Sequence, residues 1–382
     1  MKRKRSTILI IALGVLVLLV ILIWPAAPLW KKLGAEPICI NGEWPHLKIV
    51  KCTPKTEVPS ALISRPLPTL STQGAIPIIF DDDGSPDGMI ALLYFLRNPL
   101  FEVKAVTISC GEAHPEIFAP QVQQILASLG RDDIPVGIGR VTPLEGNNTF
   151  PDPWRQVSDD FWGIPIPETH IQRELFPAAE LIVETLNNST QPIMVFVIGN
   201  HTNLAEALRL DPGISDHIRE IQIMGGSIHV PGNIKSDWPA IDNSVAEWNI
   251  WVDPIAADEV FASGIPIHLT PLDATNQINW TQTDARSWID SGTPEGALAG
   301  HILQWMLDSW STGSTFIWDL VAAVNATDPS LCPEIPVAVD IVTAHGPEQG
   351  QTVIIGQMPN TIICLDPDLM QVKGLVETVL GQ

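Results

Sequence analysis

The chain has 382 residues, of which 45% are hydrophobic, so it can bury the core of one large domain or two ordinary ones. Its formal net charge is −22, with 21 Lys and Arg against 43 Asp and Glu. Because phosphate groups are bound by clustered cations, this balance argues against nucleic acid, and against an anionic membrane surface, as a partner.

The N-terminus begins with four cations, which precede an uninterrupted apolar run from Thr7 to Trp24 that continues weakly to Trp30. A run of this length can cross the hydrocarbon layer of a bilayer. A cleavable signal peptide has a shorter apolar core and small residues at its cleavage site, and "WPAAPLW" matches that pattern poorly. We therefore predict an uncleaved membrane anchor over residues 1–30, with a cleaved signal peptide as the alternative. Either way, the rest of the chain is expected to be extracytoplasmic.

Residues 31–74 are rich in Pro, Ser and Thr and have no sustained apolar period, which is typical of a tether. From residue 75 onwards, short β-type runs alternate with helix-length segments, for example "IPIIFDD" before "PDGMIALLYFLRN" and "FEVKAVTIS" before "PEIFAPQVQQILASLG". Apolar runs separated by amphipathic helices indicate βαβ units around a buried parallel sheet. We predict a single α/β domain over residues 75–382, with additional strands near its C-terminus.

The five cysteines suggest disulfides if the chain is exported. Cys39 and Cys52 could close a small loop in the tether, and Cys332 and Cys364 a larger loop, which leaves Cys110 single. The alternative is five reduced thiols, because sequence does not fix connectivity. No CxxC motif or Cys/His cluster suggests zinc.

Four acids follow the first predicted strand of the domain, in "IIFDDDGSPDG": Asp81, Asp82, Asp83 and Asp87. In open α/β sheets, ligands bind beyond the carboxyl ends of the strands. Carboxylates packed this closely repel unless a cation neutralises them or one holds a proton, and oxygen ligands favour Ca²⁺ or Mg²⁺. In a simpler alternative Asp87 caps the helix and the others face water, but this explains only one or two of the four acids.

The string "IIFDDDGS" is also close to the DxDG(T/S) signature of haloacid-dehalogenase-type phosphatases. In that alternative Asp81 is a nucleophile and Asp83 an acid/base. The reaction also needs a downstream Lys and a late acidic pair, and the remaining sequence offers no convincing set.

Residues 192–234, "PIMVFVIGNHTNLAEALRLDPGISDHIREIQIMGGSIHVPGNI", resemble the centre of the nucleoside hydrolase family of the inosine-uridine-preferring type. The family elements Gly-Pro-Leu-Thr-Asn, Met-Gly-Gly and Gly-Asn correspond to residues 199–203, 224–226 and 232–233. Further on, "AEWNIWVDPIAADEV" resembles the family's Ala-Glu-Phe-Asn segment and the helix after it. "FIWDLVAAVNATDP" resembles its late Asp-containing helix. Together these motifs favour the family over the phosphatase.

The resemblance implies a metal-assisted N-glycosidase on a Rossmann-like, mostly parallel central sheet flanked by helices. Family members hold Ca²⁺ with acids of the Asp-rich loop, a Thr backbone carbonyl and a late Asp. By resemblance, the metal ligands here are Asp83, Asp87, Thr202 and Asp319. A loop Asp would take a proton from a metal-bound water. The case for Asp319 is strengthened by its apolar neighbours, because a buried Asp needs a partner.

The resemblance also implies residues that contact the substrate. Asn233, Glu247 and Asn249 would hydrogen-bond the sugar, and Met224 would line its pocket. Nearby dipoles and anions favour the oxocarbenium-like transition state of glycosidic cleavage.

The Asp-rich loop departs from the family pattern, and two registers are possible. Without a gap, Asp83 and Asp87 are retained and Gly88 stands where a metal-binding Asp is expected. A shift by one residue pairs Asp82 with Asp87 and puts Pro86 in place of the third acid. The catalytic base is therefore Asp83 or Asp82, with Asp83 preferred.

Two further departures concern the substrate. Glu112 replaces an Asn that contacts the ribose in the family, and Trp318 replaces a late His. Purine-preferring members resemble this chain in having Trp beside the metal-binding Asp, so we expect Trp318 to stack on a purine. His114 and His201 are alternative proton donors.

The sequence thus predicts a membrane-anchored, Ca²⁺-dependent hydrolase that releases the free base and ribose from ribonucleosides, with a mild preference for purines. The family tends to form homodimers or homotetramers, so either assembly is possible here, and the sequence does not decide the oligomeric state. A non-hydrolytic ribosyl-ligand-binding protein of the same fold is the main alternative.

Overall fold

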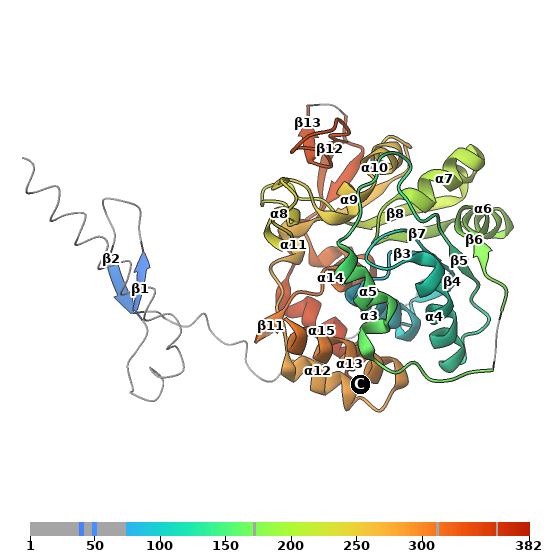
Figure 1. Cartoon of the computed structure of the whole chain (residues 1–382), viewed down its shortest axis with the longest axis horizontal. Coiled ribbons are helices and arrows are strands. Elements are labelled where there is room, and N and C mark those ends of the chain that lie inside the picture. The colour runs from blue at the N-terminus through green and yellow to red at the C-terminus, as the bar shows by residue number, and fades with distance from the viewer. Residues whose placement is uncertain (1–37, 42–47, 52–73, 171–172, 311–312, 357) are drawn as a thin grey trace, which may run out of the picture. The chain divides into compact units, whose positions relative to one another are not determined.

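The computed structural model describes residues 38–41, 48–51 and 74–382, apart from 171–172, 311–312 and 357 (Figure 1). The chain divides into two units, Met1–Ala61 and Leu62–Gln382. In the first unit, β1 (Ile38–Asn41) pairs antiparallel with β2 (Lys48–Lys51). The predicted anchor over residues 1–30 and Cys52 lie outside the described residues, so the anchor and the Cys39–Cys52 pair stay predictions. No helix in the described part of the chain is long and apolar enough to span a bilayer.

A central sheet organises the second unit. Its strands are β3 (Ile76–Asp82), β4 (Phe101–Ile108), β5 (Val136–Ile138), β6 (Phe176–Pro177), β7 (Ile193–Val197), β8 (Ile218–Met224), β9 (Ile267–Thr270), β12 (Ile335–Ile341), β13 (Thr352–Ile355) and β14 (Thr361–Ile363). Within the described residues they lie in the order β13-β12-β14-β9-β8-β7-β3-β4-β5-β6. All neighbours from β14 to β6 are parallel, and only β12 is antiparallel to its two neighbours. The predicted mostly parallel α/β sheet is confirmed.

Helices cover both faces of this sheet. They are α3 (Pro86–Arg97), α4 (Pro115–Ser128), α5 (Asp152–Asp159), α6 (Ala178–Asn188), α7 (Thr202–Leu210), α8 (Ile234–Asp237), α9 (Trp248–Val252), α10 (Pro254–Phe261), α11 (Leu272–Thr275), α12 (Gln282–Ile289), α13 (Pro294–Ser309), α14 (Trp318–Thr327) and α15 (Leu369–Leu380). In β3, Ile78 and Phe80 join the core beneath α3, α4, α13, α14 and α15, whereas Ile79 joins the core beneath α6, α7 and α10. Burial on both faces explains why this strand reads as one continuous apolar run.

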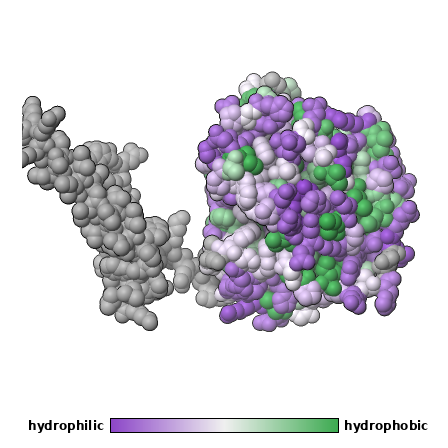
Figure 2. Space-filling view, viewed as in Figure 1, coloured by the Kyte–Doolittle hydropathy of each residue, from purple (hydrophilic) through white to green (hydrophobic). Residues whose placement is uncertain are grey.

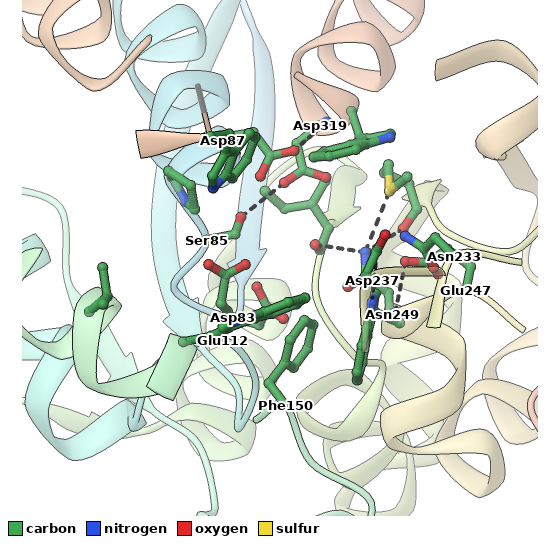
Figure 3. Close-up of a pocket in the computed structure, with 18 of the residues that line it drawn as sticks. Asp83, Ser85, Asp87, Glu112, Phe150, Asn233, Asp237, Glu247, Asn249 and Asp319 are labelled. Carbon is green, nitrogen blue, oxygen red and sulfur yellow. Dashed lines mark hydrogen bonds between the residues drawn. The ribbon is translucent and has the colours of Figure 1, made fainter. Parts of the chain in front are cut away.

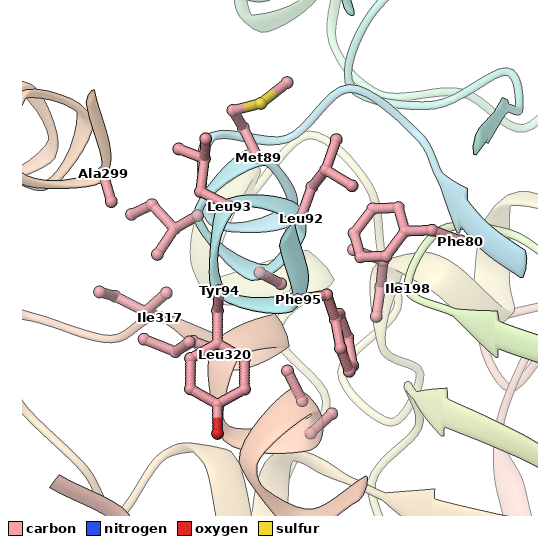
Figure 4. Close-up of a cluster of buried hydrophobic side chains, with 14 of the residues drawn as sticks. Phe80, Met89, Leu92, Leu93, Tyr94, Phe95, Ile198, Ala299, Ile317 and Leu320 are labelled. Atoms are coloured by element: carbon pink, nitrogen blue, oxygen red, sulfur yellow. The ribbon is translucent and has the colours of Figure 1, made fainter. Parts of the chain in front are cut away.

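Helix α3 is buried on all sides and fixes the segment that carries the acids. Its N-cap is Ser85, whose Oγ accepts a hydrogen bond from the N–H of Gly88 at 2.9 Å, and Pro86 occupies the first turn. The helix packs against α13, α14 and α15, and Figure 4 shows its apolar side chains between those of the sheet and of α14. The hydroxyl of Tyr94 lies 3.0 Å from Thr327 Oγ1 on α14. These contacts hold the start of α3 in one position.

The strand order creates a crevice beside β3. The chain runs from β3 to β4, β5 and β6 on one side, and then crosses to β7 on the other side of β3. Helices that follow β3 and β7 therefore leave the sheet in opposite directions, which opens a crevice at the carboxyl ends of the two strands. The four acids of the Asp-rich loop lie at this end.

The surface of the domain in Figure 2 is mainly hydrophilic, with hydrophobic residues in smaller groups. Large exposed apolar side chains such as Val141, Leu210 and Met358 come from separate segments of the sequence. Scattered apolar residues of this kind are normal on protein surfaces.

The predicted pair Cys332–Cys364 is confirmed as a disulfide, and Cys110 is a free, buried thiol. The bond joins residues 32 positions apart, so it limits the freedom of the unfolded chain. We expect Cys332→Ser/Cys364→Ser to lower the free energy of unfolding by about 2–4 kcal/mol in chemical denaturation. A reducing agent should lower the stability of the unaltered protein and leave that of the variant unchanged. Equal stability of the variant and the unaltered protein without a reducing agent would contradict this expectation.

Candidate active site

A cavity of about 700 Å³ lies at the carboxyl ends of the central strands (Figure 3). Asp83 and Asp87 follow β3, Glu112 follows β4, and Ile198 follows β7, while Met224 ends β8. Each of these residues lines the cavity. The crevice expected from the strand order is therefore where the polar residues gather.

Asp83 is buried to 1% exposure and is wedged between two glycines. A β-carbon at Gly111 would overlap its Oδ2, and one at Gly199 would lie 2.5 Å from its Cβ. Burial, followed by the charges of Asp82, Glu112 and Asp87, raises the pKa of Asp83 well above its ordinary value. Its Oδ2 has no hydrogen-bond partner.

Asp87 and Asp319 meet although 232 positions separate them in the sequence. The N–H of Asp319 donates to Asp87 Oδ2 at 3.3 Å, and Ser85 Oγ donates to Asp319 Oδ2 at 3.2 Å. Burial raises the pKa of both carboxyls, and the charges of Asp87, Asp82 and Asp83 raise that of Asp319 further. In Figure 3 the carboxyl groups of Asp83, Asp87 and Asp319 face one hollow.

This group of acids fits a hard cation by its chemistry. Asp82 Oδ2 and Asp83 Oδ2 are buried without hydrogen-bond partners, and oxygen ligands of this kind suit Ca²⁺ or Mg²⁺. In the side-chain arrangement seen here, no three Asp, Glu, His or Cys residues of the described chain converge closely enough to form a metal site. The donors fit such an ion, and their side chains would have to turn toward it.

Thr202, a predicted metal ligand, does not line the cavity. It is the first residue of α7, and its Oγ1 donates to Asp253 Oδ2 at 2.6 Å. A carbonyl in the first helical turn points along the helix axis. Strand β7 ends before Thr202, at Val197, and the next residue, Ile198, lines the cavity. The carbonyl oxygen of Ile198 accepts from Asn249 Nδ2 at 3.0 Å. The end of the apolar run "IMVFVI" was the signal that could have identified it.

Asp82 also lies outside the lining of the cavity, although it is fully buried. Its Oδ1 accepts from the N–H of Asp83 at 2.9 Å. Of the two candidate bases, only Asp83 faces the space in which a substrate could bind.

The predicted sugar contacts all line the cavity, on the side opposite the acids in Figure 3. Asn249 Nδ2 bridges the ends of β7 and β8, because it also donates to the carbonyl of Met224 at 3.1 Å. Glu247 caps α9: its Oε1 accepts from the N–H of Asn249 at 2.9 Å, and its Oε2 from that of Gly226 at 2.9 Å. Asn233 Oδ1 is buried and has no partner.

Glu112 lines the cavity beside Asp83. Ser158 Oγ donates to its Oε1 at 3.3 Å, and Trp162 Nε1 donates to Ser158 Oγ at 3.2 Å. Burial, followed by the charge of Asp87, raises the pKa of Glu112 to about 8. A protonated carboxyl at this position can donate a hydrogen bond, as the amide that it replaces would.

Aromatic residues form much of the remaining wall. Phe150 and Trp248 stack with ring centres 4.7 Å apart, and Trp154 lies 5.6 Å from Trp248. Trp310 and Trp318 lie 6.4 Å apart, and Trp318 Nε1 donates to Asn276 Oδ1 at 2.8 Å. Of the aromatic lining residues, only Trp318 was predicted as a substrate contact, and the 13 tryptophans of the chain were the available signal for the others.

The phosphatase alternative is wrong, because Asp81 cannot act as a nucleophile. Its carboxylate is fully buried outside the cavity, where Oδ1 accepts from Thr107 Oγ1 at 2.6 Å and Asn203 Nδ2 at 2.8 Å. Burial raises the pKa of Asp81 to about 7. The hydrogen bonds of Asp81 connect β3 to β4 and to α7.

Neither His114 nor His201 lines the cavity. His114 Nδ1 lies 2.7 Å from Asp159 Oδ2. The ring of His201 is fully buried without hydrogen-bond partners, and burial lowers its pKa to about 3. Both are poorly placed to protonate a leaving group in the cavity.

Comparisons with known proteins agree with this geometry. A model of the family described as inosine-uridine preferring nucleoside hydrolase matches residues 78–373. The pyrimidine-specific ribonucleoside hydrolase RihA of Citrobacter koseri is 31% identical over 304 residues, which cover 77% of this chain and 94% of that protein. The protein of the same name from Salmonella typhi is 32% identical over the same shares.

Solved structures share the fold. A purine-preferring ribonucleoside hydrolase from Gardnerella vaginalis superposes with a TM-score of 0.68 at 24% identity, covering 79% of this chain and 99% of that one. An inosine-uridine preferring nucleoside hydrolase from Bacillus anthracis gives 0.67 at 22% identity, covering 80% and 99%.

The family match spans most of the chain, and named ribonucleoside hydrolases exceed 30% identity over 77% of it. The protein is therefore a hydrolase that belongs to the inosine-uridine-preferring nucleoside hydrolase family.

Proposed function

We propose that this enzyme hydrolyses the N-glycosidic bond of ribonucleosides with the help of bound Ca²⁺ and prefers purine nucleosides. The observation that carries the proposal is that Asp83, Asp87 and Asp319 line one cavity, where the N–H of Asp319 donates to Asp87 and Asp83 Oδ2 has no partner. These carboxylates and the carbonyl of Ile198 would hold the ion. Bound Ca²⁺ would supply a site for the ribose hydroxyls and lower the pKa of a water.

Asp83 acts as the general base in this proposal. Gly111 and Gly199 pack closely against its side chain, and as a residue that lines the cavity Asp83 can accept a proton from a water there. Asn233, Glu247 and Asn249 orient the sugar from the opposite wall. The electron pair of the broken bond leaves with the base, and the proposal assigns no protein residue as its proton donor.

The aromatic walls support a preference for purines. Trp318 and Trp310 lie on one part of the lining, and Phe150, Trp154 and Trp248 on another, so a base could contact aromatic faces over a large area. A purine offers more ring area to such a wall than a pyrimidine does. The RihA relatives are named pyrimidine-specific, so the base preference distinguishes this proposal from a transfer of their specificity.

The membrane anchor, the extracytoplasmic location and assembly into homodimers or homotetramers stay predictions from the sequence. They do not alter the chemistry proposed for the cavity.

Replacing Asp83 tests the base directly. We expect Asp83→Asn to lower kcat for inosine by about 10²–10⁴-fold, the usual contribution of a general base, while the protein stays folded. Asp81→Asn is the matched control, because Asp81 is equally buried two residues earlier and lies outside the cavity. It should keep kcat within about threefold, since the amide oxygen can still accept from Thr107 and Asn203. Similar kcat values for the two variants, or no release of base by the unaltered enzyme, would refute the proposal.

The base preference is tested by comparing inosine with uridine. The unaltered enzyme should have the higher kcat/KM for inosine. Trp318→Ala should raise KM for inosine by roughly 5- to 30-fold, because stacking of a base on an aromatic ring contributes about 1–2 kcal/mol. Phe316→Ala is the control, since Phe316 lies 5.7 Å from Trp318 but does not line the cavity. A preference for uridine would make the purine assignment wrong.

The buried acids predict an unusual pH dependence of stability. Burial raises the pKa of Asp82 and Glu247 to about 7 and that of Glu112 to about 8, above their values in an unfolded chain. The folded state therefore retains protons that the unfolded chain releases, so the free energy of unfolding falls as pH rises from about 4 to about 8. In EDTA, the Tm should fall over this range.

Calcium should reduce this fall, because a cation among the carboxylates favours their ionised forms, and its binding should release protons. The measurement is thermal unfolding across the pH range with EDTA or with excess Ca²⁺. A Tm that rises with pH in EDTA would contradict the expected sign.

A further inference from the structure

Gly88 stands at the position where the family pattern has an acid, in the first turn of α3. A β-carbon built on it would overlap Asp82 Oδ1 and lie 2.8 Å from Ser85 Oγ. The space that a side chain at residue 88 would enter is therefore already filled by a carboxylate from the end of β3. The acid in this space therefore belongs to β3 and not to α3.

Asp82 is placed to serve the same group of acids. Ser85 Oγ, which borders the space at residue 88, donates to Asp319 Oδ2 at 3.2 Å. The negative charge of Asp82 raises the pKa of Asp83 and of Asp319, and that of Asp87 raises the pKa of Asp82. The carboxylate of Asp82 therefore lies within electrostatic reach of Asp83, Asp87 and Asp319.

The partners of Asp82 leave one oxygen free. Its Oδ1 accepts from the N–H of Asp83 at 2.9 Å, but its Oδ2 is buried without a partner. Asp81 Oδ2 is also buried without a partner, but Asp81 Oδ1 accepts from both Thr107 and Asn203, and Asp81 is not among the nearest neighbours of a β-carbon at residue 88. A buried carboxylate whose second oxygen has no donor is costly unless a cation completes its surroundings.

We propose that Asp82 supplies the carboxylate that residue 88 supplies in the family pattern, and that Gly88 is required because any side chain there would displace it. The ion is then held by Asp82, Asp83, Asp87 and Asp319, with the ligand position moved from the first turn of α3 to the end of β3. This inference rests on the proposed Ca²⁺-dependent function.

An exchange of the two positions tests the inference. Ca²⁺ affinity is measured by isothermal titration calorimetry on the full chain after treatment with EDTA. Asp82→Ala should weaken binding by about tenfold or more, because it removes one carboxylate ligand. Gly88→Asp alone should also weaken it, because its side chain competes with Asp82 for one space. Asp82→Ala/Gly88→Asp should restore the affinity to within about threefold of the unaltered protein, since the carboxylate returns to the same place.

Asp82→Ala/Gly88→Ala is the matched control, because it fills the space without restoring the charge and should stay weak. Asp82→Asn keeps the shape of the side chain and provides a variant without the charge if Asp82→Ala unfolds. Equal affinity of the two double variants, or unaltered affinity in Asp82→Asn, would overturn the inference while leaving the proposed function intact. No Ca²⁺ binding to the unaltered protein would overturn both the inference and the Ca²⁺ dependence of the proposed function.

Discussion

The burial of like charges at the end of β3 is the constraint on which the rest of this structure depends. Asp82, Asp83, Asp87 and Asp319 are each at most 6% exposed, and their hydrogen-bond donors are neutral. Inside a protein such carboxylates repel strongly, and either protons or a cation must compensate them. A fold that tolerates this cost at one place, and at the crevice of its sheet, is suited to bind an ion there.

Holding the acids against their repulsion requires a rigid frame. Helix α3 supplies part of it, because its residues from Pro86 to Phe95 are all buried and cannot shift without disturbing the core. Glycines supply another part. Gly111 and Gly199 allow the ends of β4 and β7 to approach Asp83 more closely than any side chain would permit. The position of Asp83 is therefore fixed by packing as much as by hydrogen bonds.

The parallel sheet could be predicted because its strands are buried on both faces and read as continuous apolar runs, as "IPIIF" does. Motifs also located Asp319, which has charged neighbours only in three dimensions. Thr202 was predicted at the cavity but Ile198 lines it instead, because a motif marks a segment without showing where its strand ends. Phe150 and Trp154 were missed because they belong to a segment without a motif, and only tertiary packing brings them to the cavity. The sequence shows that residue 88 lacks the expected acid, but it does not show that the carboxylate of Asp82 fills the space there.

The contact between Asp87 and Asp319 also has a consequence for how the molecule matures. Asp87 and Asp319 lie 232 positions apart in the sequence, so the two acids cannot meet until α14 has been synthesised and has packed against α3. Contacts of such long range form late, after the entropy of closing the loop has been overcome. The contact between these acids is thus acquired only by the completed fold, and a chain that stops short of residue 319 carries Asp83 and Asp87 without Asp319.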